Sequence, residues 1–135
     1  MYLLDSSICI DFLRGRLPYG YEVFKQIDPS LIKIPSIAAA ELRTGAMKSS
    51  APRRNSMNLE NFMAPFEIIP FDNTCATAYA ELRTELETHG KKIGQNDLMI
   101  AAMAVAHGAV LVTQDMKHFP RIQRLHMESW AETEL

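Results

Sequence analysis

Short apolar runs alternate along the chain with longer segments that have the spacing of helices. A short apolar run bounded by turn-forming residues is typical of a buried parallel strand. The clearest run of this kind is Ala109–Thr113. The pattern predicts strands at Tyr2–Leu4, Leu31–Ile34, Phe66–Ile69, Ala109–Thr113 and Leu125–Glu128.

Between the predicted strands lie segments with the capping and terminating residues of helices. Helices are expected at Ile8–Leu13, Tyr19–Ile27, Ile37–Lys48, Asn55–Met63, Asn73–Thr88 and Leu98–His107. The segment Ser49–Arg54 is polar and contains a proline, so we expect it to be a connection. The helix Leu98–His107 is apolar on nearly every side, which predicts that it is buried.

Strands that alternate with helices predict an α/β fold, in which helices cover both faces of a mainly parallel sheet. The length of 135 residues suits one domain, spanning residues 1–135. In such sheets ligands bind outside the carboxyl ends of the strands. The residues that follow each predicted strand are therefore the candidates for chemistry.

Composition and charge narrow the possible functions. The formal net charge of −2 shows no basic excess, so a role with nucleic acid has to rest on a specific site and on local patches. Cys9 and Cys75 form no metal-binding spacing and predict no disulfide framework. We expect a cytoplasmic protein that does not enter a membrane, since no basic leader and no apolar run of about 20 residues is present.

Four acidic residues stand where the strand-end rule points. Asp5 directly follows the first predicted strand, and Asp115 lies two residues past the fourth. Asp97 opens the buried helix, and Glu41 lies on the helix that follows the second strand. The helical neighbours of Glu41 are small or apolar, so its side chain is expected to point inward or at a site.

Each acid alone also has a purely structural explanation. Asp5 suits a helix cap, Asp97 the helix dipole and Asp115 a turn, while Glu41 could reach solvent. Together, however, four acids at one edge of one sheet would repel one another unless a cation neutralised them. The set therefore predicts a cation site.

Oxygen ligands favour Mg²⁺ or Mn²⁺. Such an ion lowers the pKa of a bound water and neutralises charge on phosphate oxygens, which suits phosphodiester cleavage. The histidines show no zinc-site spacing and are expected at the surface or in the core: His89, His107, His118 and His126.

Three stretches together resemble the PIN-domain toxins of the VapC type. The opening YLLDSSICIDFL resembles their first motif, and PSIAAAELRTG resembles the helix that carries their second acid. The stretch IGQNDLMIAAMAVAHGAVLVTQDMKHF resembles their third and fourth motifs. The motifs occur in the family's order and cover nearly the whole chain.

The resemblance implies a three-layer α/β/α PIN-like fold and an endoribonuclease that depends on Mg²⁺ or Mn²⁺. It makes Asp5, Glu41, Asp97 and Asp115 the catalytic acids, with Asp5 and Asp97 as the primary metal ligands. The implied supporting residues are Ser6, Ser7 and Thr113. Ser7 departs from the asparagine that the family often has there.

The resemblance further implies an RNA substrate, a cognate antitoxin that inhibits the enzyme, and a homodimer. The apolar segments around Tyr19–Phe24 and Leu59–Phe66 suit either a partner surface or ordinary core. Basic residues near the strand ends are candidates for RNA phosphate contacts. They are Arg14, Arg16, Lys91, Lys92 and Lys117.

Two other function classes stay open at this point. A PIN-like domain without catalytic activity would be a binding module, although all four acids are in place. A phospho-acceptor domain similar to bacterial receivers also gathers acids at strand ends. That class needs an acid pair after the first strand, whereas the chain has only Asp5 there.

Overall fold

The strands of the protein form one sheet that is parallel throughout. The computed structural model describes residues 1–16 and 18–130, and the side chains of 17–21 lie outside the described set. The sheet has the order β3-β2-β1-β4-β5. Its strands are β1 (Tyr2–Leu4), β2 (Ile32–Pro35), β3 (Glu67–Ile69), β4 (Val110–Val112) and β5 (His126–Glu128).

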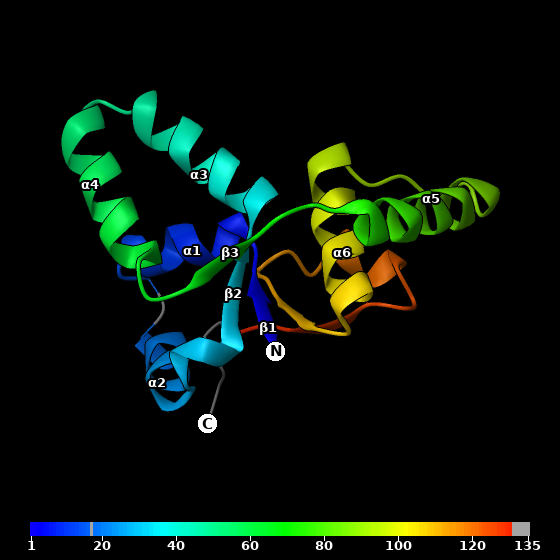
Figure 1. Ribbon diagram of the computed structural model, residues 1–135, viewed down its shortest axis with the longest axis horizontal. Coiled ribbons are helices and arrows are strands. Elements are labelled where there is room, and N and C mark those ends of the chain that lie inside the picture. Colours follow the sequence, from blue (N-terminus) through cyan, green and yellow to red (C-terminus); the bar gives the residue numbers. More distant parts are fainter. Residues whose placement is uncertain (17, 131–135) are drawn as a thin grey trace.

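The order of the strands places a switch point beside β1. The chain proceeds from β1 to β2 and β3, then crosses back past β1 to add β4 and β5 on its other side. The connections are α1 (Ser6–Leu13), α2 (Pro18–Gln26), η1 (Pro29–Leu31), α3 (Ser36–Met47), α4 (Pro52–Met63), α5 (Asn73–Thr88), α6 (Gln95–His107) and η2 (Phe119–Arg121). Helices α1 to α4 lie on one side of the strands, and α5 and α6 on the other (Figure 1). The predicted three-layer α/β/α architecture is confirmed.

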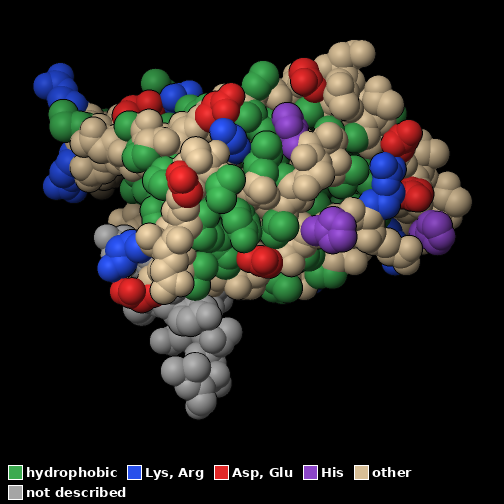
Figure 2. Space-filling view, turned by 60° about the horizontal axis from the view of Figure 1, so that its bottom comes forward, with side chains coloured by type: hydrophobic (Ala, Val, Ile, Leu, Met, Phe, Trp, Pro, Cys, Tyr) green, Lys and Arg blue, Asp and Glu red, His purple; other side chains and the backbone are tan. Residues whose placement is uncertain are grey.

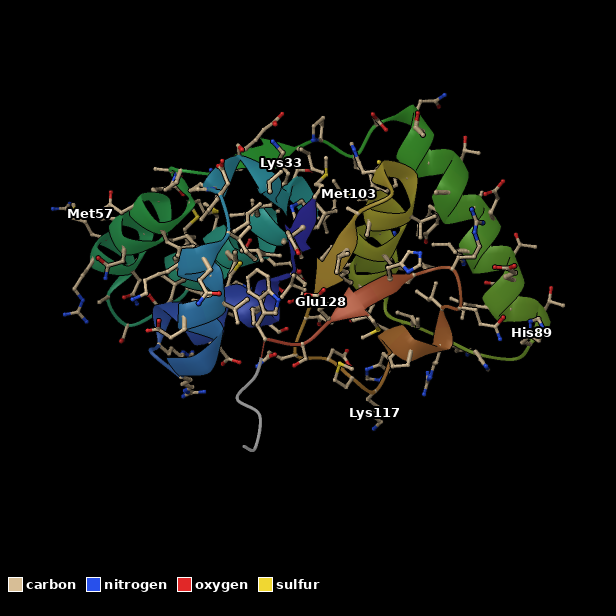
Figure 3. The ribbon with its side chains drawn as sticks, turned by 90° about the horizontal axis from the view of Figure 1, so that it is seen from below. Lys33, Met57, His89, Met103, Lys117 and Glu128 are labelled. Carbon is tan, nitrogen blue, oxygen red and sulfur yellow. The ribbon has the colours of Figure 1, made fainter. Side chains whose placement is uncertain are left out.

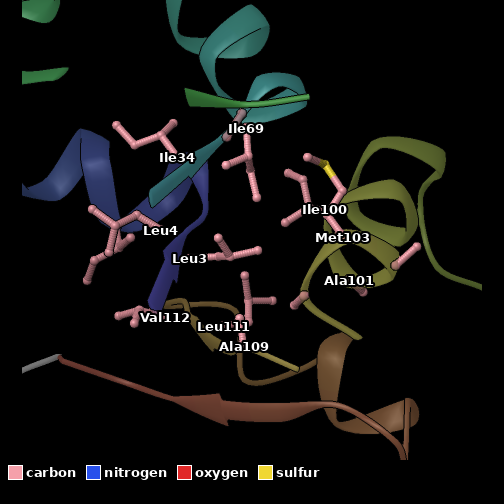
Figure 4. Close-up of a cluster of buried hydrophobic side chains, with 14 of the residues drawn as sticks. Leu3, Leu4, Ile34, Ile69, Ile100, Ala101, Met103, Ala109, Leu111 and Val112 are labelled. Carbon is pink, nitrogen blue, oxygen red and sulfur yellow. The ribbon is translucent and has the colours of Figure 1, made fainter. Parts of the chain in front are cut away.

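The central strands bury side chains on both faces, as parallel strands covered by helices do. Leu3 of β1 pairs with Leu111 of β4, and both point toward α6, where Ile100 is fully buried (Figure 4). The next pair, Leu4 and Val112, points to the opposite face. This alternation follows from the two-residue period of a strand.

Two helix ends illustrate how local chemistry sets the boundaries. Helix α4 begins at Pro52, so the expectation of a connection through residue 54 was wrong. Proline has no N–H to donate, but N–H groups in the first turn of a helix have no carbonyl partner within the helix, so Pro52 can start it. Helix α6 ends at Gly108, whose φ of 59° is a left-handed conformation that favours glycine.

Aromatic rings fasten α2 to the rest of the molecule. The Phe24 ring lies 4.7 Å from the Phe12 ring of α1 and 5.4 Å from the ring of Phe66, measured between centroids. Phe62 of α4 and Trp130 also lie within 6.4 Å of Phe24. Offset and edge-on ring pairs of this kind stabilise a core beyond the area they bury.

Two apolar segments, around Tyr19–Phe24 and Leu59–Phe66, suited either a partner surface or the core. Their described apolar side chains belong to the core. Leu59 and Met63 of α4 are each only 2% exposed, and Phe66 is buried as well. Val23 and Phe24 pack against the same core. The side chain of Tyr19 lies outside the described residues.

The side of the molecule that carries the amino end of β1 shows no large patch of side chains of a single charge. Acidic and basic side chains are interspersed there, with apolar side chains between them (Figure 2). Both cysteines are buried thiols without a disulfide. Within residues 1–16 and 18–130, no helix has the length and apolar character needed to cross a membrane.

We expect Phe24→Ala to destabilise the protein by about 2–4 kcal/mol. The substitution removes the ring that the rings of Phe12, Phe62, Phe66 and Trp130 surround. Urea unfolding of the variant beside wild type measures the loss. Met57→Ala, at a side chain that is 61% exposed, is the matched control and should change the unfolding free energy by under about 0.5 kcal/mol. Equal effects of the two substitutions would contradict the role assigned to Phe24.

Candidate active site

The four acids predicted from the sequence come together at the carboxyl edge of the sheet. Asp5 follows β1 and Asp115 follows β4, and these strands are neighbours. Asp97 lies in the first turn of α6, and Glu41 lies in the middle of α3. The fold therefore gathers acids from four separate segments at the switch point, where open α/β sheets bind ligands.

Asp5 is the most constrained of the acids. It is only 4% exposed, and it caps α1 by accepting a hydrogen bond from the Ile8 N–H at 3.1 Å. The same oxygen, Oδ1, accepts a hydrogen bond from Ser7 Oγ at 2.8 Å, and Oδ2 accepts one from the Thr113 hydroxyl. Burial raises the pKa of Asp5, and these donors offset that effect only in part.

Thr113 connects the two strand ends. Its hydroxyl donates to Asp5 and accepts a hydrogen bond from the Asp115 N–H at 2.9 Å. The Gln114 N–H also donates to Ser7 Oγ, at 3.3 Å. Because Thr113 is fully buried, this network fixes the loop after β4 against the start of α1.

Asp115 is held by the loop that follows it. Its Oδ1 accepts hydrogen bonds from the N–H groups of Lys117 and His118, both at 3.0 Å. Its Oδ2 lies 3.0 Å from Nδ1 of the His118 imidazole. Burial acts to raise the pKa of Asp115, but the hydrogen bonds from His118 and Lys117 outweigh it and lower that pKa.

His118 is a site residue that the sequence analysis missed, since it was expected at the surface or in the core. The spacing of three residues from Asp115 was visible, but a histidine three residues after an aspartate is common. The contact arises because the loop folds back on the Asp115 carboxylate, which only the tertiary structure shows.

Glu41 reaches the site from α3 through two contacts. Ser6 Oγ donates to its Oε1 at 3.1 Å, and Asn96 Nδ2 donates to its Oε2 at 3.4 Å. The side chain is half-buried, as the small and apolar helix face predicted. Asn96 is the second residue that sequence analysis missed, because nothing in its local pattern indicates a contact with α3.

Asp97 carries the unbalanced charge of the site. Burial and the negative charges of Glu41, Asp115 and Asp5 all raise its pKa. No donor among the described residues is hydrogen-bonded to its carboxylate. The backbone nearby is that of Gly94, where an added Cβ would stand 4.0 Å from Oδ2 of Asp97. Asp97 is therefore the acid with both oxygens free for a ligand.

The donor set fits a hard cation that keeps part of its water shell. In the part of the chain that the structure describes, no three His, Cys, Asp or Glu side chains form a ready metal cage. Mg²⁺ is typically held by one or two carboxylates together with waters and substrate phosphate, so it needs no such cage. Asp97 offers two free oxygens, and Asp5 Oδ2 retains one acceptor position.

The structure has no acid where a receiver-like phospho-acceptor domain would need one. The phosphate-accepting aspartate of such a domain would end the third strand, but here β3 is the edge strand of the sheet. The nearest acid, Asp72, instead caps α5 by accepting a hydrogen bond from the Cys75 N–H at 3.0 Å.

Known proteins resemble the chain over nearly its whole length. The chain is 40% identical to Ribonuclease VapC2 of Rickettsia felis, over 96% of this chain and 98% of that protein. It is 34% identical to the tRNA(fMet)-specific endonuclease VapC of Salmonella typhimurium, over the same shares of the two chains.

Solved structures give the same result. The crystal structure of R. felis VapBC2 bound to a promoter DNA fragment matches with a TM-score of 0.90 at 40% identity, covering 96% of this chain and 98% of that one. The DNA-bound VapBC structure from S. typhimurium matches with a TM-score of 0.91 at 34% identity and the same coverage. The family model described as PIN domain matches residues 2–125. The chain thus belongs to the PIN-domain family and, within it, to the VapC ribonucleases.

Proposed function

We propose that the protein is an endoribonuclease toxin that depends on Mg²⁺ or Mn²⁺, with Asp5, Glu41, Asp97 and Asp115 as its catalytic residues. Membership of the VapC ribonucleases supports RNA as the substrate. The observation that carries the proposal is the charge balance of the acidic edge. Burial and three neighbouring carboxylates raise the pKa of Asp97, an arrangement that costs stability unless a cation is bound.

Asp5 and Asp97 are the proposed metal ligands. A bound divalent ion would supply a more acidic water and would neutralise charge on the phosphate oxygens. Asp97 has both oxygens free, while Asp5 presents Oδ2 from a position fixed by Ser7 and Thr113. These contacts orient the ligands in advance, so little reorganisation is needed when substrate binds.

Glu41 and Asp115 act beside that pair. Ser6 and Asn96 direct the two oxygens of Glu41, which suits the carboxylate to accept a proton from an attacking water. Asp115 accepts three hydrogen bonds from Lys117 and His118, so only one acceptor position on Oδ2 is free for water. Ser6, Ser7 and Thr113 are positioning residues.

The cationic residues near the strand ends are the proposed phosphate contacts. Lys117 follows Asp115 closely and extends away from the body of the molecule (Figure 3). Phosphate contacts position RNA and carry little sequence information. The others in this set are Arg14, Arg16, Lys91 and Lys92.

A cognate antitoxin is the proposed inhibitor, as the VapBC complexes of relatives suggest. The surface that suits it is a groove of about 270 Å³ between α1, α3 and α4, here called the α1–α3–α4 groove. Ile10 and Leu13 line it and are 36% and 40% exposed, and Gly45 leaves space in its wall. An amphipathic helix fits a groove of this kind.

A homodimer in the cytoplasm remains a prediction from the family. Light scattering during size-exclusion chromatography tests the oligomer directly.

We expect Asp97→Asn to reduce cleavage at least about 100-fold, because it removes the one carboxylate with two free oxygens. The measurement is cleavage of tRNA(fMet) and of total cellular RNA by the antitoxin-free protein, with Mg²⁺ or Mn²⁺ and with a chelator. Asp72→Asn, at an exposed helix cap, is the matched control and should retain activity. Metal-independent cleavage, or equal activity of both variants, would contradict the assignment.

The metal-free protein should become more stable when Asp97 is neutralised. The folded state raises the pKa of Asp97, so its ionised form destabilises the fold above that pKa, and the penalty disappears as the pH falls and Asp97 is protonated. In chelator at neutral pH, Asp97→Asn should raise the Tm by roughly 1–3 °C, since solvent screens this half-exposed group. The difference should shrink near pH 4, and a lower Tm for the variant would refute the repulsion.

Gly45→Leu should weaken inhibition by the antitoxin at least about 10-fold while cleavage persists. A Cβ at position 45 meets nothing within 4 Å, and a leucine there extends into the α1–α3–α4 groove, which Gly45 lines. Replacing glycine inside a helix also stabilises it by about 0.5–1 kcal/mol. Titration of cleavage with purified cognate antitoxin measures the effect, with Gly45→Ala as control. Unchanged inhibition by the leucine variant would place the antitoxin elsewhere.

A further inference from the structure

A second groove lies on the other side of the acidic edge, between the C-terminal half of α5 and the start of α6. We call it the α5–α6 groove. It encloses about 530 Å³, a size within the range of ligand sites in proteins. Its lining combines apolar surface with cationic side chains, and the residues used below are Tyr79, Arg83, Lys91, Lys92 and Ile93.

This groove and the acid cluster share a wall. The loop residues Lys91, Lys92 and Ile93 and the first residue of α6, Gln95, border the groove, and Gly94 lies between them in the chain. Two residues further on, Asp97 faces the acid cluster, with its Oδ2 close to Gly94. A chain whose phosphate sits at the acids can therefore continue over this loop into the groove.

The shared wall is held firmly from both sides. The Lys91 N–H donates to the Leu86 carbonyl at 2.8 Å, which fastens the loop to the end of α5. The Arg121 guanidinium of η2 donates to the Lys92 carbonyl. Because the backbone carries these bonds, the side chains of both lysines are left to contact a ligand.

The charges of the groove favour an anionic ligand. Lys91 and Lys92 are exposed, and no carboxylate among the described residues forms an ion pair with either. Arg83 bonds Glu87 at 3.0 Å and also donates to the Tyr79 hydroxyl at 3.3 Å. The half-buried Tyr79 ring thus contacts one neutralised cation, Arg83, and shares the lining of the groove with two lysines that have no ion-pair partner among the described residues.

We propose that the α5–α6 groove binds the single-stranded RNA segment that flanks the scissile phosphodiester. Lys91 and Lys92 contact its phosphates, and a base packs against the apolar surface of Tyr79 and Ile93. Cationic grooves with aromatic surfaces are the general means of holding single-stranded nucleic acid. The inference rests on the proposed ribonuclease function and adds a location for the substrate strand.

The test measures binding separately from cleavage. The probe is a fluorescein-labelled single-stranded RNA of about a dozen nucleotides with mixed sequence, within the usual site size. In the Asp97→Asn background, Lys91→Ala with Lys92→Ala should weaken binding roughly 10-fold. It should also lower the slope of log Kd against log salt by about 1.4, since each lost phosphate contact contributes about 0.7.

The matched control removes two adjacent arginines far from the groove. Arg53→Ala with Arg54→Ala makes the same change in net charge on α4, the helix of Met57, which lies at the opposite end of the molecule from His89 of α5 (Figure 3). It should leave the Kd within about 2-fold of the parent. Equal weakening by both pairs would show a general charge effect and overturn the proposal.

A crosslink locates the strand. The same RNA containing 4-thiouridine should crosslink to Tyr79 or its neighbours in the groove, as mapped by mass spectrometry. If Lys91→Ala with Lys92→Ala leaves RNA binding unchanged, the proposal is overturned, whether or not the oligomeric state changes. The groove would then be a site for a protein partner. If RNA is bound in the groove but not cleaved by wild type, the ribonuclease function fails while the binding site stands.

Discussion

The hydrogen bond from Thr113 to Asp5 joins the ends of β1 and β4, the strands between which the sheet reverses its order. Both residues are buried, and a buried carboxylate is tolerated only where donors are already in place. The Thr113 hydroxyl also accepts the Asp115 N–H, so one side chain sets the positions of two acids. The rest of the site is arranged around this pair: Glu41 and Asp97 approach it from helices on opposite faces of the sheet.

Holding several acids together works against folding, and the apolar core has to offset that repulsion. Helix α6 shows how: its first turn carries Asp97, whose pKa is raised by burial and by its acidic neighbours, while Ile100 and Met103 further along the helix are fully buried in the core. Burying such side chains stabilises the fold by roughly 1.5–3 kcal/mol each. The buried apolar turns therefore hold α6 in place, so Asp97 in its first turn can be used in the active site.

The two grooves lie on different sides of the acidic edge. The α1–α3–α4 groove is formed by helices on one face of the sheet, and the α5–α6 groove by helices on the other (Figure 1). The first combines apolar and small residues with Arg14 and the polar side chains of Ser49, Asn55 and Asn58, and the second is cationic around a tyrosine. The two proposals place the antitoxin and the RNA mainly on different sides of the acidic edge, while Arg14, a proposed phosphate contact, lines the groove assigned to the antitoxin.

Much of this protein was determined by its sequence alone. Apolar runs and capping residues predicted the five strands and the helices α1 to α6 to within about three residues at each end, while the short 3-10 helices η1 and η2 were not predicted. The start of α4 was placed late because Pro52 suggested a break. Strand ends followed by acids predicted Asp5 and Asp115 at one edge, since parallel strands align their carboxyl ends. These features depend on local periodicity and on a general rule of topology, so a single sequence contains them.

Only the tertiary structure decided which side chains meet. The contacts of His118 with Asp115, and of Asn96 with Glu41, depend on how a loop folds back and how two helices from different segments are juxtaposed. The α5–α6 groove likewise depends on a loop before α6 that Arg121 of η2 contacts from a distant part of the chain. Such contacts are settled by packing between residues distant in the chain, and local pattern carries no information about them.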